Sequence, residues 1–157
     1  MSNKLTQEIL HRLAIYQPTT GLFTRLDGSY FHQYVSHGYA LISLGKYKYQ
    51  RVHRLAFLFM EGSFPANIVD HIDGNRLNNK WENLRHATSS QNMQNQRRAR
   101  KNNTTGFLGV SKYNACKFEA RITIEGMTVN IGVFDTAEEA HEAYVKVKRE
   151  LHPFGEV

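Results

Sequence analysis

The sequence lacks several features that define large classes of proteins. It has a single cysteine, Cys116, among its 157 residues, which excludes an internal disulfide and a zinc site built from several cysteines. Its longest uninterrupted apolar run, Leu55 to Met60, is too short to cross a bilayer, so no membrane partner is expected. The first residues, MSNKLTQEIL, contain no apolar core of a secretory signal. These absences predict an intracellular, cytoplasmic protein.

Acidic residues are also few relative to basic ones. The chain has 20 Lys and Arg against 14 Asp and Glu, a formal net charge of +6. Basic residues cluster in KYKYQRVHR (46–54) and RRARK (97–101), and neither stretch contains an acid. Such a surplus either favours solubility or binds a polyanion, and composition alone leaves both open. With 41% hydrophobic residues, the chain can form one large domain or two small ones.

The last third of the sequence has the clearest pattern of secondary structure. FLGVS (107–111) and KFEARITI (117–124) predict two strands, the second with alternating apolar and polar side chains. MTVNIGVF (127–134) predicts a third strand that forms a hairpin with the second. The residues expected on the apolar face of this third strand are Met127, Val129, Ile131 and Val133.

A helix is expected directly after this hairpin. Thr136 and Glu139 have the spacing of a capping box, and apolar residues follow at helical spacing. Pro153 is expected to end the helix. The predicted fold of this part is a three-stranded antiparallel sheet with one helix on its apolar face and a polar face left open.

The first part of the chain is less regular. Leu5 to Ala14 predicts a short helix, and residues 20–26 and 39–44 predict strands. His53 to Glu61 predicts a second helix that stops at Gly62. The apolar residues of this second helix are interpreted as core. Helices and strands in both parts predict an α+β fold class.

Four polar residues stand out between residues 68 and 92. Asp70 and His71 follow an apolar strand directly. Asn83 precedes a second short strand, and Asn92 lies in the first turn of a helix that opens with the capping pattern of residues 88–91. A strand, a loop, a strand and a helix in this order would bring these four side chains close together.

These residue types suit hydrolysis of a phosphodiester. Carboxylate and amide oxygens suit a hard cation such as Mg²⁺ or Mn²⁺, and a neutral imidazole suits a general base near pH 7. Asn83 can hold strand and loop together and orient His71 without adding charge. The alternative is an Asn-rich loop with an exposed histidine, which explains the turns but not an Asp-His pair before the loop.

The stretch VDHIDGN…NN…ENLRHAT…QN resembles the HNH endonuclease motif, in the form found in phage and intron-encoded homing endonucleases. HRLAFLFMEGSFP (53–65) resembles the same family. The resemblance implies a ββα-metal fold in which Asp70 and Asn92 are the metal ligands. It further implies that His71 is the general base and that Asn83 is the middle Asn of the motif.

The same resemblance implies the cofactor and the partner. Mg²⁺ or Mn²⁺ is expected at the site, with double-stranded DNA as substrate, no small-molecule cofactor, and the bacterial host cell of a phage or mobile element as the location. Many relatives brace this region with a cysteine-bound structural zinc, and a chain whose only cysteine is Cys116 is expected to hold none. A monomer is expected, and a dimer is left open.

A second resemblance covers the C-terminal part. TTGFLGVS…KFEARI…G…IGVFDTAEEAHEAY resembles the plant ethylene-response-factor-type DNA-binding domain of the APETALA class, which also occurs fused to HNH nucleases in phages. The resemblance implies a sheet that lies in the major groove of DNA. The residues expected to contact DNA from this sheet are Lys112, Tyr113, Lys117, Arg121, Thr123, Thr128 and Asn130. Those expected to do so from the two basic stretches are Arg51, His53, Arg54, Arg97, Arg98, Arg100 and Lys101.

These patterns together predict four segments and a leading function. Residues 1–48 are expected to be an α/β extension of the nuclease unit, 49–96 the HNH nuclease, 97–106 a basic connector and 107–157 the DNA-binding domain. The leading hypothesis is a metal-dependent DNA endonuclease of the homing type. Two alternatives stay open: a non-catalytic, sequence-specific DNA-binding regulator with a vestigial nuclease unit, and a toxin-like nonspecific nuclease.

Overall fold

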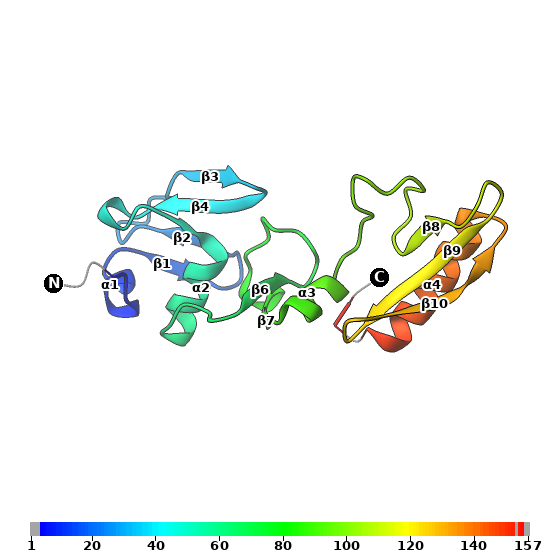
Figure 1. The fold of residues 1–157 in the computed structure, drawn as a ribbon. Coiled ribbons are helices and arrows are strands. Elements are labelled where there is room, and N and C mark those ends of the chain that lie inside the picture. The colour runs from blue at the N-terminus through cyan, green and yellow to red at the C-terminus, as the bar shows by residue number, and fades with distance from the viewer. Residues whose placement is uncertain (1–3, 153, 156–157) are drawn as a thin grey trace. The chain divides into compact units, whose positions relative to one another are not determined.

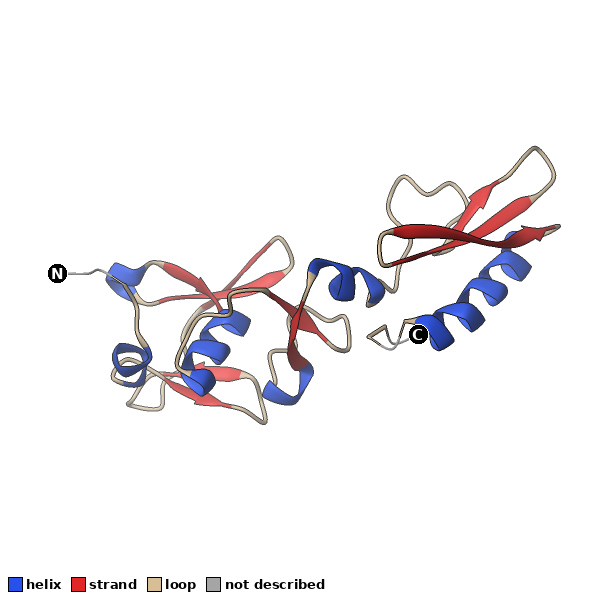
Figure 2. Ribbon diagram, turned by 60° about the horizontal axis from the view of Figure 1, so that its bottom comes forward, coloured by secondary structure: helices blue, strands red, loops and turns tan. Residues whose placement is uncertain are grey.

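The computed structural model describes residues 4–152, 154 and 155, and the chain folds as two compact units (Figures 1 and 2). The first unit is Met1–Ala87 and the second is Thr88–Val157. Each unit has its own hydrophobic core. The boundary between the units lies earlier in the chain than the predicted connector, and the four predicted segments remain a prediction. Pro153, expected to end the last helix, lies outside the described residues.

The first unit combines two hairpins, a three-stranded sheet and two α-helices (Figure 1). Its elements are α1 (Gln7–His11), β1 (Ile15–Gln17), β2 (Leu22–Thr24), β3 (Gln33–Ser36), β4 (Tyr39–Ser43), η1 (Gly45–Tyr47), β5 (Tyr49–Arg51), α2 (Val52–Glu61), β6 (Ile68–His71), η2 (Trp81–Asn83) and β7 (Leu84–Ala87). Strands β1 and β2 pair with each other, as do β6 and β7, while β3, β4 and β5 form one antiparallel sheet in that order.

Helix α2 lies at the centre of the first core. Leu55 and Ala56 are fully buried, and Phe57 and Leu58 are nearly so, which confirms the interpretation of this helix as core. Gly62 ends the helix in the left-handed conformation at φ 83°, where its N–H donates to the carbonyl of Leu58. Glycine adopts this conformation without the steric cost that a side chain imposes.

The first 48 residues are part of this core and not an appendage to it. Leu10, Phe23 and Ile42 come from three different elements of this segment, and each is buried to 1% exposure or less in the same cluster as the α2 residues. The Gln7 side chain donates a hydrogen bond to the Phe59 carbonyl at 2.8 Å, which ties α1 to α2. Removing this segment would expose the apolar side of α2 to water, at a cost of roughly 25 cal/mol per Å².

The second unit contains the predicted sheet and helix. Its elements are α3 (Ser89–Gln94), β8 (Val110–Lys112), β9 (Phe118–Ile124), β10 (Met127–Phe134) and α4 (Ala137–Leu151). The strands form an antiparallel sheet in the order β10, β9, β8, and α4 packs on it through a core that includes Ala120, Ile122 and Tyr144 (Figure 2). Both predicted capping boxes are present, at Thr88 with Gln91 and at Thr136 with Glu139. The predicted α+β fold class is confirmed.

One prediction about the face of β10 is wrong. The register shifts between Asn130 and Gly132, so that Val133 pairs with Glu119 and Phe134 pairs with Phe118. Beyond this bulge, Phe134 takes the apolar face and Val133 lies 41% exposed beside the polar one. A bulge adds one residue to a strand and reverses the alternation that follows it.

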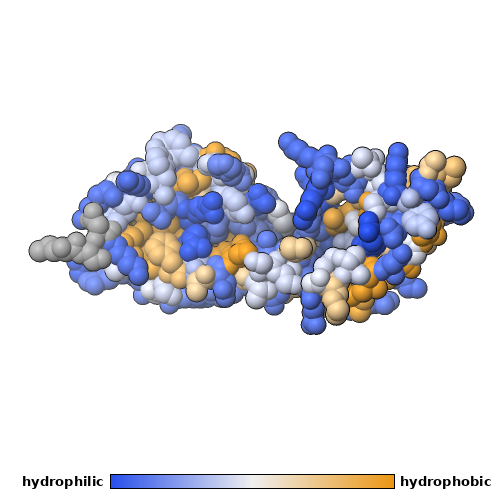
Figure 3. All heavy atoms as spheres, viewed as in Figure 1, coloured by the Kyte–Doolittle hydropathy of each residue, from blue (hydrophilic) through white to orange (hydrophobic). Residues whose placement is uncertain are grey.

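Apolar surface remains at this end of the sheet. Met127 is 69% exposed and Val129 is 46% exposed, although both lie on the apolar face. Figure 3 shows hydrophobic atoms around the part of the unit formed by β10 and α4, within a surface that is otherwise mostly hydrophilic. The helix therefore covers the apolar face only in part.

The segment between α3 and β8 contains no helix or strand, and hydrogen bonds of one side chain order its last part. The Asn103 amide donates to the carbonyls of Phe107 and Val110, and its oxygen accepts from the backbone N–H groups of Thr105 and Gly106. This one side chain therefore shapes the turn that leads into β8, as asparagine often does in loops. No helix in the described part of the chain is long and apolar enough to span a membrane.

Candidate active site

The candidate active site is built on the β6–β7 hairpin of the first unit. Asp70 pairs with Arg85 across the two strands, and His71 pairs with Leu84. Val69 and His71 lie on one side of β6 and Asp70 on the other, since side chains alternate along a strand. Asp70 and His71 are 5% and 4% exposed, so the structure places a carboxylate and an imidazole in the interior at the end of one strand.

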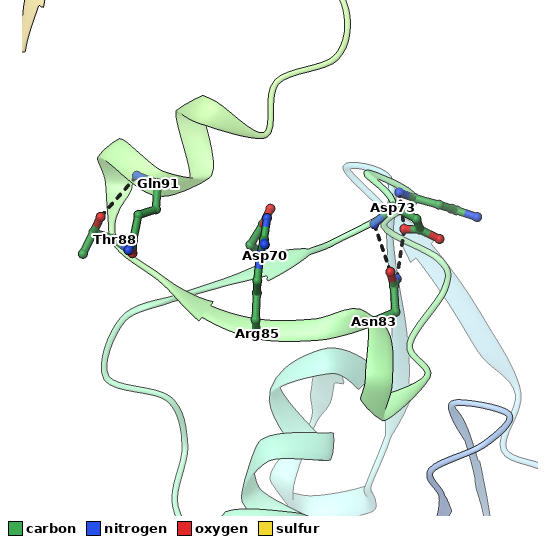
Figure 4. A network of polar contacts seen from close by, with 7 residues as sticks. Asp70, Asp73, Asn83, Arg85, Thr88 and Gln91 are labelled. Atoms are coloured by element: carbon green, nitrogen blue, oxygen red, sulfur yellow. Dashed lines mark hydrogen bonds and ion pairs between the residues drawn. The ribbon is translucent and has the colours of Figure 1, made fainter. Parts of the chain in front are cut away.

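Asp70 has a basic partner directly opposite (Figure 4). The Arg85 Nε and Nη2 atoms both lie 2.9 Å from Oδ2 of Asp70. Such a charge-assisted pair fixes the orientation of a buried carboxylate. Asp70 therefore supplies a carboxylate oxygen inside the protein, which is the kind of donor that a hard divalent cation prefers.

The His71 ring is oriented by Asn79, a residue that was not predicted. His71 Nε2 lies 3.2 Å from Oδ1 of Asn79, and Asn79 Nδ2 donates to the Leu77 carbonyl at 3.1 Å. The second bond fixes which amide atom faces the ring, because only Nδ2 can donate. Oδ1 can only accept, so Nε2 of His71 carries the proton and Nδ1 carries the lone pair. The signal for Asn79 was the second asparagine of the NN pair in the motif.

Asn83 braces the loop between the two strands (Figure 4). Its Nδ2 donates to Oδ1 of Asp73 at 2.9 Å and to the Asn78 carbonyl at 2.8 Å, and its Oδ1 accepts from the Asp73 N–H at 2.9 Å. The Asn83 carbonyl also accepts from the N–H of Ile72. Asn83 thus holds strand and loop together as predicted, while the residue in contact with the imidazole is Asn79.

Asp73 belongs to the same network. Partial burial raises the pKa of its carboxyl, but hydrogen bonds from the Asn78 side chain, the Asn75 N–H and Asn83 outweigh burial and hold the pKa below its ordinary value. The loop therefore contains an ionised carboxylate with three donors around it. These hydrogen bonds hold the loop in place from within.

The β1–β2 hairpin closes this loop from the N-terminal side. The Tyr16 hydroxyl donates to the Asn79 carbonyl at 2.6 Å, and the Trp81 N–H donates to the Pro18 carbonyl at 2.9 Å. A Cβ atom on Gly21 would lie 2.3 Å from the Asn79 carbonyl carbon, so only glycine allows this approach. The β1–β2 hairpin thus holds in place the loop residue Asn79, which contacts His71.

A second histidine lies against the first. His53, at the start of α2, is 4% exposed, and its ring centroid is 5.2 Å from that of His71 and 5.0 Å from that of Tyr39. Its Nδ1 atom is buried and has no hydrogen-bond partner among the described residues. Burial above all, and then the neighbouring His71, Arg51 and Arg54, lower the pKa of His53 to about 3.

Burial also lowers the pKa of His71. Contacts with Asn79, Asp73 and Asp70 act in the opposite direction but do not reverse the shift. Both imidazoles are therefore neutral at pH 7. A neutral imidazole is the form that can accept a proton.

Acid is expected to destabilise the first unit through His53. Between the folded-state pKa near 3 and the ordinary value of 6.5, the unfolded chain binds a proton that the folded chain does not. Stability should therefore fall as the pH is lowered from 7 to 4, by roughly 3 kcal/mol from this one group. Urea unfolding followed by the fluorescence of Trp81, the single tryptophan, measures this loss.

The variant His53→Gln isolates that contribution. It removes the titrating group, so its loss of stability between pH 7 and pH 4 should be smaller than that of the wild type by the same amount. His32→Gln, which replaces an exposed histidine of the same unit, serves as the matched control and is expected to keep the wild-type loss. Equal losses in wild type and His53→Gln would show that His53 is not held neutral.

Asn92 lies on α3, which belongs to the second unit. The helix starts at Ser89, with Thr88 as its cap, and Asn92 is exposed on it. Its backbone N–H donates to the Thr88 carbonyl at 2.9 Å. The structure therefore confirms the predicted order of strand, loop, strand and helix, and the role of Asn92 as a metal ligand remains a prediction.

The predicted DNA contacts of the basic stretches lie in different environments. Arg51 is exposed on β5, and Arg54 is half-buried and donates to the Pro65 carbonyl at 3.0 Å. His53 is in the interior, against His71. The residues exposed in the segment after α3 are Arg97, Arg98, Arg100 and Lys101.

The predicted contacts of the second unit are all exposed, and six of them lie on or beside the open face of its sheet. The expectation that Lys112 lies on this face is wrong, because Lys112 pairs with Phe118 and shares the apolar face of the buried Val110. Several of them already contact one another or an acid. Arg121 lies 3.2 Å from Glu119 and donates to Ser111, Asn130 donates to Glu119, and Lys117 lies 2.8 Å from Asp135. The remaining predicted contacts are Lys112, Tyr113, Thr123 and Thr128, of which the two threonine hydroxyls are 3.3 Å apart. A DNA phosphate would compete with acids on this face, so contact with DNA there stays a prediction.

A β-hairpin with a buried Asp-His pair at the end of its first strand, followed by a capped helix, defines the class of ββα-metal nucleases. Comparison with known proteins agrees with this class. Residues 50–94 match the family model described as HNH endonuclease. The matched range contains the whole hairpin, its loop and α3.

Three known proteins are similar to the chain. The uncharacterized HNH endonuclease L560 of Acanthamoeba polyphaga mimivirus is 38% identical over 72% of this chain and 56% of its own length. The DNA endonuclease I-HmuI of Bacillus phage SP01 is 44% identical over 52% of this chain and 45% of its own length. Protein 3.8 of Escherichia phage T7 is 34% identical over 68% of this chain and 88% of its own length.

The chain belongs to the HNH endonuclease family. It spans about half the length of the mimivirus and SP01 relatives and most of the length of protein 3.8. No solved structure matches it. The matching family model ends at residue 94, before the sheet of the second unit, and does not assign that sheet to a family.

Proposed function

We propose that the protein is a metal-dependent endonuclease that hydrolyses phosphodiester bonds in duplex DNA. The observation that carries the proposal is the buried His71 imidazole, kept neutral by burial and held by Asn79, with the Asp70 carboxyl directly before it in the same strand. Membership of the HNH family supports it, as does similarity to a phage protein named as a DNA endonuclease.

In this proposal His71 is the general base. Its Nε2 proton is engaged with Oδ1 of Asn79, so Nδ1 receives the proton of the attacking water. Asn79 stabilises the imidazolium that forms, because its carbonyl-type oxygen faces the N–H that becomes more acidic. Asn83 keeps the loop that carries Asn79 in place through its bonds to Asp73 and Asn78.

Asp70 and Asn92 would hold a divalent cation, Mg²⁺ or Mn²⁺. The donor set fits such an ion, because it combines a charged carboxylate with a neutral amide oxygen and contains no sulfur. The bound ion would polarise the scissile phosphate and stabilise the leaving oxygen. Arg85 orients Asp70 from the opposite strand. The role of Asn92 rests on its position in the motif, within the matched residues 50–94.

We further propose that the activity is of the homing type and that the second unit binds DNA. Its three-stranded sheet presents an open face with Arg121, Thr123 and Asn130, and the segment before it is rich in exposed arginine. Such a module would position the nuclease on a chosen duplex, in the manner that the resemblance to the APETALA-class domain implies.

Metal removal tests the proposal. Supercoiled plasmid incubated with the full chain and Mg²⁺ is expected to be nicked or linearised, and EDTA should abolish the reaction. Binding should weaken steeply as salt rises, since each phosphate contact releases condensed counterions. Tight, salt-dependent binding without any cleavage in Mg²⁺ or Mn²⁺ would contradict the nuclease and favour a DNA-binding regulator. Equal cleavage of unrelated duplexes would contradict the homing type.

A further inference from the structure

The open face of the sheet formed by β3, β4 and β5 reaches the candidate active site. Ala40 and Ile42 point into the core from β4, so Tyr39 and Leu41 point away from it. Leu41 pairs with Arg51 of β5, which puts Tyr39 and Arg51 on the same open face. The Tyr39 ring is half-buried, with its centroid 5.0 Å from that of His53 and 6.2 Å from that of His71.

Two guanidinium groups lie on this one ring. The central carbon of Arg51 is 5.0 Å from the Tyr39 centroid, and that of Arg76 is 4.8 Å from it. Arg76 comes from the loop between β6 and β7, the same loop that carries Asn79. Its Nη1 donates to the His37 carbonyl at 3.3 Å, in the tight turn between β3 and β4. Two elements far apart in sequence therefore direct arginines to one place beside His71.

This pair of charges lacks the carboxylate partners that Arg85 and Arg121 have. Arg85 is paired with Asp70, and Arg121 with Glu119. Arg51 and Arg76 are both exposed, and neither forms an ion pair with a carboxylate among residues 4–152, 154 and 155. Like charges held on one ring repel each other, and an anion bound between them removes that repulsion. Arginine binds phosphate with a planar pair of N–H donors, and an aromatic face fixes its plane.

We propose that Arg51 and Arg76, held on the Tyr39 ring beside His71, form a clamp that binds a backbone phosphate of the DNA strand that is cut. The clamp rests on the proposed endonuclease function, to which it adds two residues, Arg76 and Tyr39, that the motif does not single out. It places a phosphate of the substrate near the imidazole, which fixes the strand for attack at the adjoining bond.

Salt dependence of binding tests the clamp separately from cleavage. Duplex binding is measured by gel shift across a salt series, with the full chain carrying His71→Ala so that the DNA stays intact. Adding Arg76→Gln is expected to reduce the slope of log affinity against log salt by about one, and adding Arg51→Gln as well should reduce it by about two. Arg76→Lys keeps the positive charge and should leave the slope of log affinity against log salt unchanged. Tyr39→Leu removes the ring on which both arginines lie and should lower the affinity for the duplex several-fold.

Arg25→Gln is the matched control. Arg25 is also exposed and stacks on an aromatic ring, with its central carbon 4.6 Å from the centroid of Phe31, but its hydrogen bonds go to Ser29 and Tyr30 in its own turn. It should keep the wild-type slope. A merely structural role for Arg76, as a tie between loop and hairpin, would lower the thermal midpoint of Arg76→Gln and leave the slope unchanged, and that result overturns the clamp.

The outcomes for the clamp and for the nuclease can be told apart. If the wild type cleaves DNA and Arg76→Gln leaves the slope of log affinity against log salt unchanged, the clamp is wrong and the endonuclease function is retained. If the wild type fails to cleave but Arg76→Gln lowers the slope, the endonuclease is wrong and the clamp stands as a DNA contact. If the chain binds no duplex at all, both are wrong.

Discussion

Replacing His71 with alanine is expected to lower the rate of DNA cleavage in Mg²⁺ by about 10²- to 10⁴-fold, the usual contribution of a general base. The affinity for the same duplex should change by less than about threefold, because the buried ring, with 4% exposure, offers DNA little surface to contact. Single-turnover cleavage of a labelled duplex gives the rate, and gel shift gives the affinity. The two measurements together separate loss of chemistry from loss of binding.

The control for this substitution is His86→Ala. His86 lies on β7 of the same hairpin, where it is exposed, packs against Phe57 and pairs with Glu61 at 2.9 Å. It should keep nearly full activity. Trp81 fluorescence in urea confirms that the first unit of each variant is folded. Cleavage at the wild-type rate by a folded His71→Ala chain would exclude His71 as the base.

Gly21→Ala is expected to destabilise the first unit by at least about 3 kcal/mol and to impair cleavage in the fraction that remains folded. Gly21 has φ +75°, where a side chain is strained, and its added Cβ would lie 2.3 to 2.6 Å from backbone atoms of Asn79 and Lys80. Backbone atoms cannot rotate out of the way. The overlap can be relieved only by moving the β1–β2 hairpin away from the loop, which releases the residue that orients His71.

The control Gly28→Ala separates the cost of the left-handed backbone conformation from the cost of the steric overlap with the loop. Gly28 has φ +84°, but its added Cβ would meet nothing within 4 Å. This control should cost only about 1 kcal/mol and leave the cleavage rate of the folded protein intact. Urea unfolding and single-turnover cleavage are measured for both variants. Equal stability losses would mean that the contact between the hairpin and the loop contributes nothing.

Much of the site could be predicted because it is local in sequence. Asp70 and His71 are adjacent, and an apolar strand before them with a turn after them is enough to place both at the end of a hairpin. The capping boxes at Thr88 and Thr136 depend on residues three positions apart. Such short-range patterns do not depend on contacts with distant parts of the chain.

The residues around the imidazole could not be found in this way. In the sequence, Asn79 cannot be distinguished from the other asparagines of the loop, and only the structure shows its hydrogen bond to His71. His53 was predicted to contact DNA because it lies in a basic stretch, and only the structure shows that it is buried. Tyr39 and Arg76 meet because the β3–β4 turn and the site loop lie together, which no pattern in either segment indicates. The face of Val133 was mispredicted because a bulge has no clear sequence signature.

By itself, the sequence determined the strands and helices of the second unit, helix α2, the Asp-His pair and the family to which they belong, since periodicity, capping and motif spacing are properties of neighbouring residues. It did not predict strands β1, β3 and β5 of the first unit. Only the tertiary structure decided that side chains between Leu5 and Leu44 share one core with α2, that Asn79 contacts the imidazole, and that two arginines share one tyrosine ring. The physical reason is that burial and packing join side chains across large sequence separations. The low pKa of His53 and the close approach at Gly21 exist only once those segments have come together.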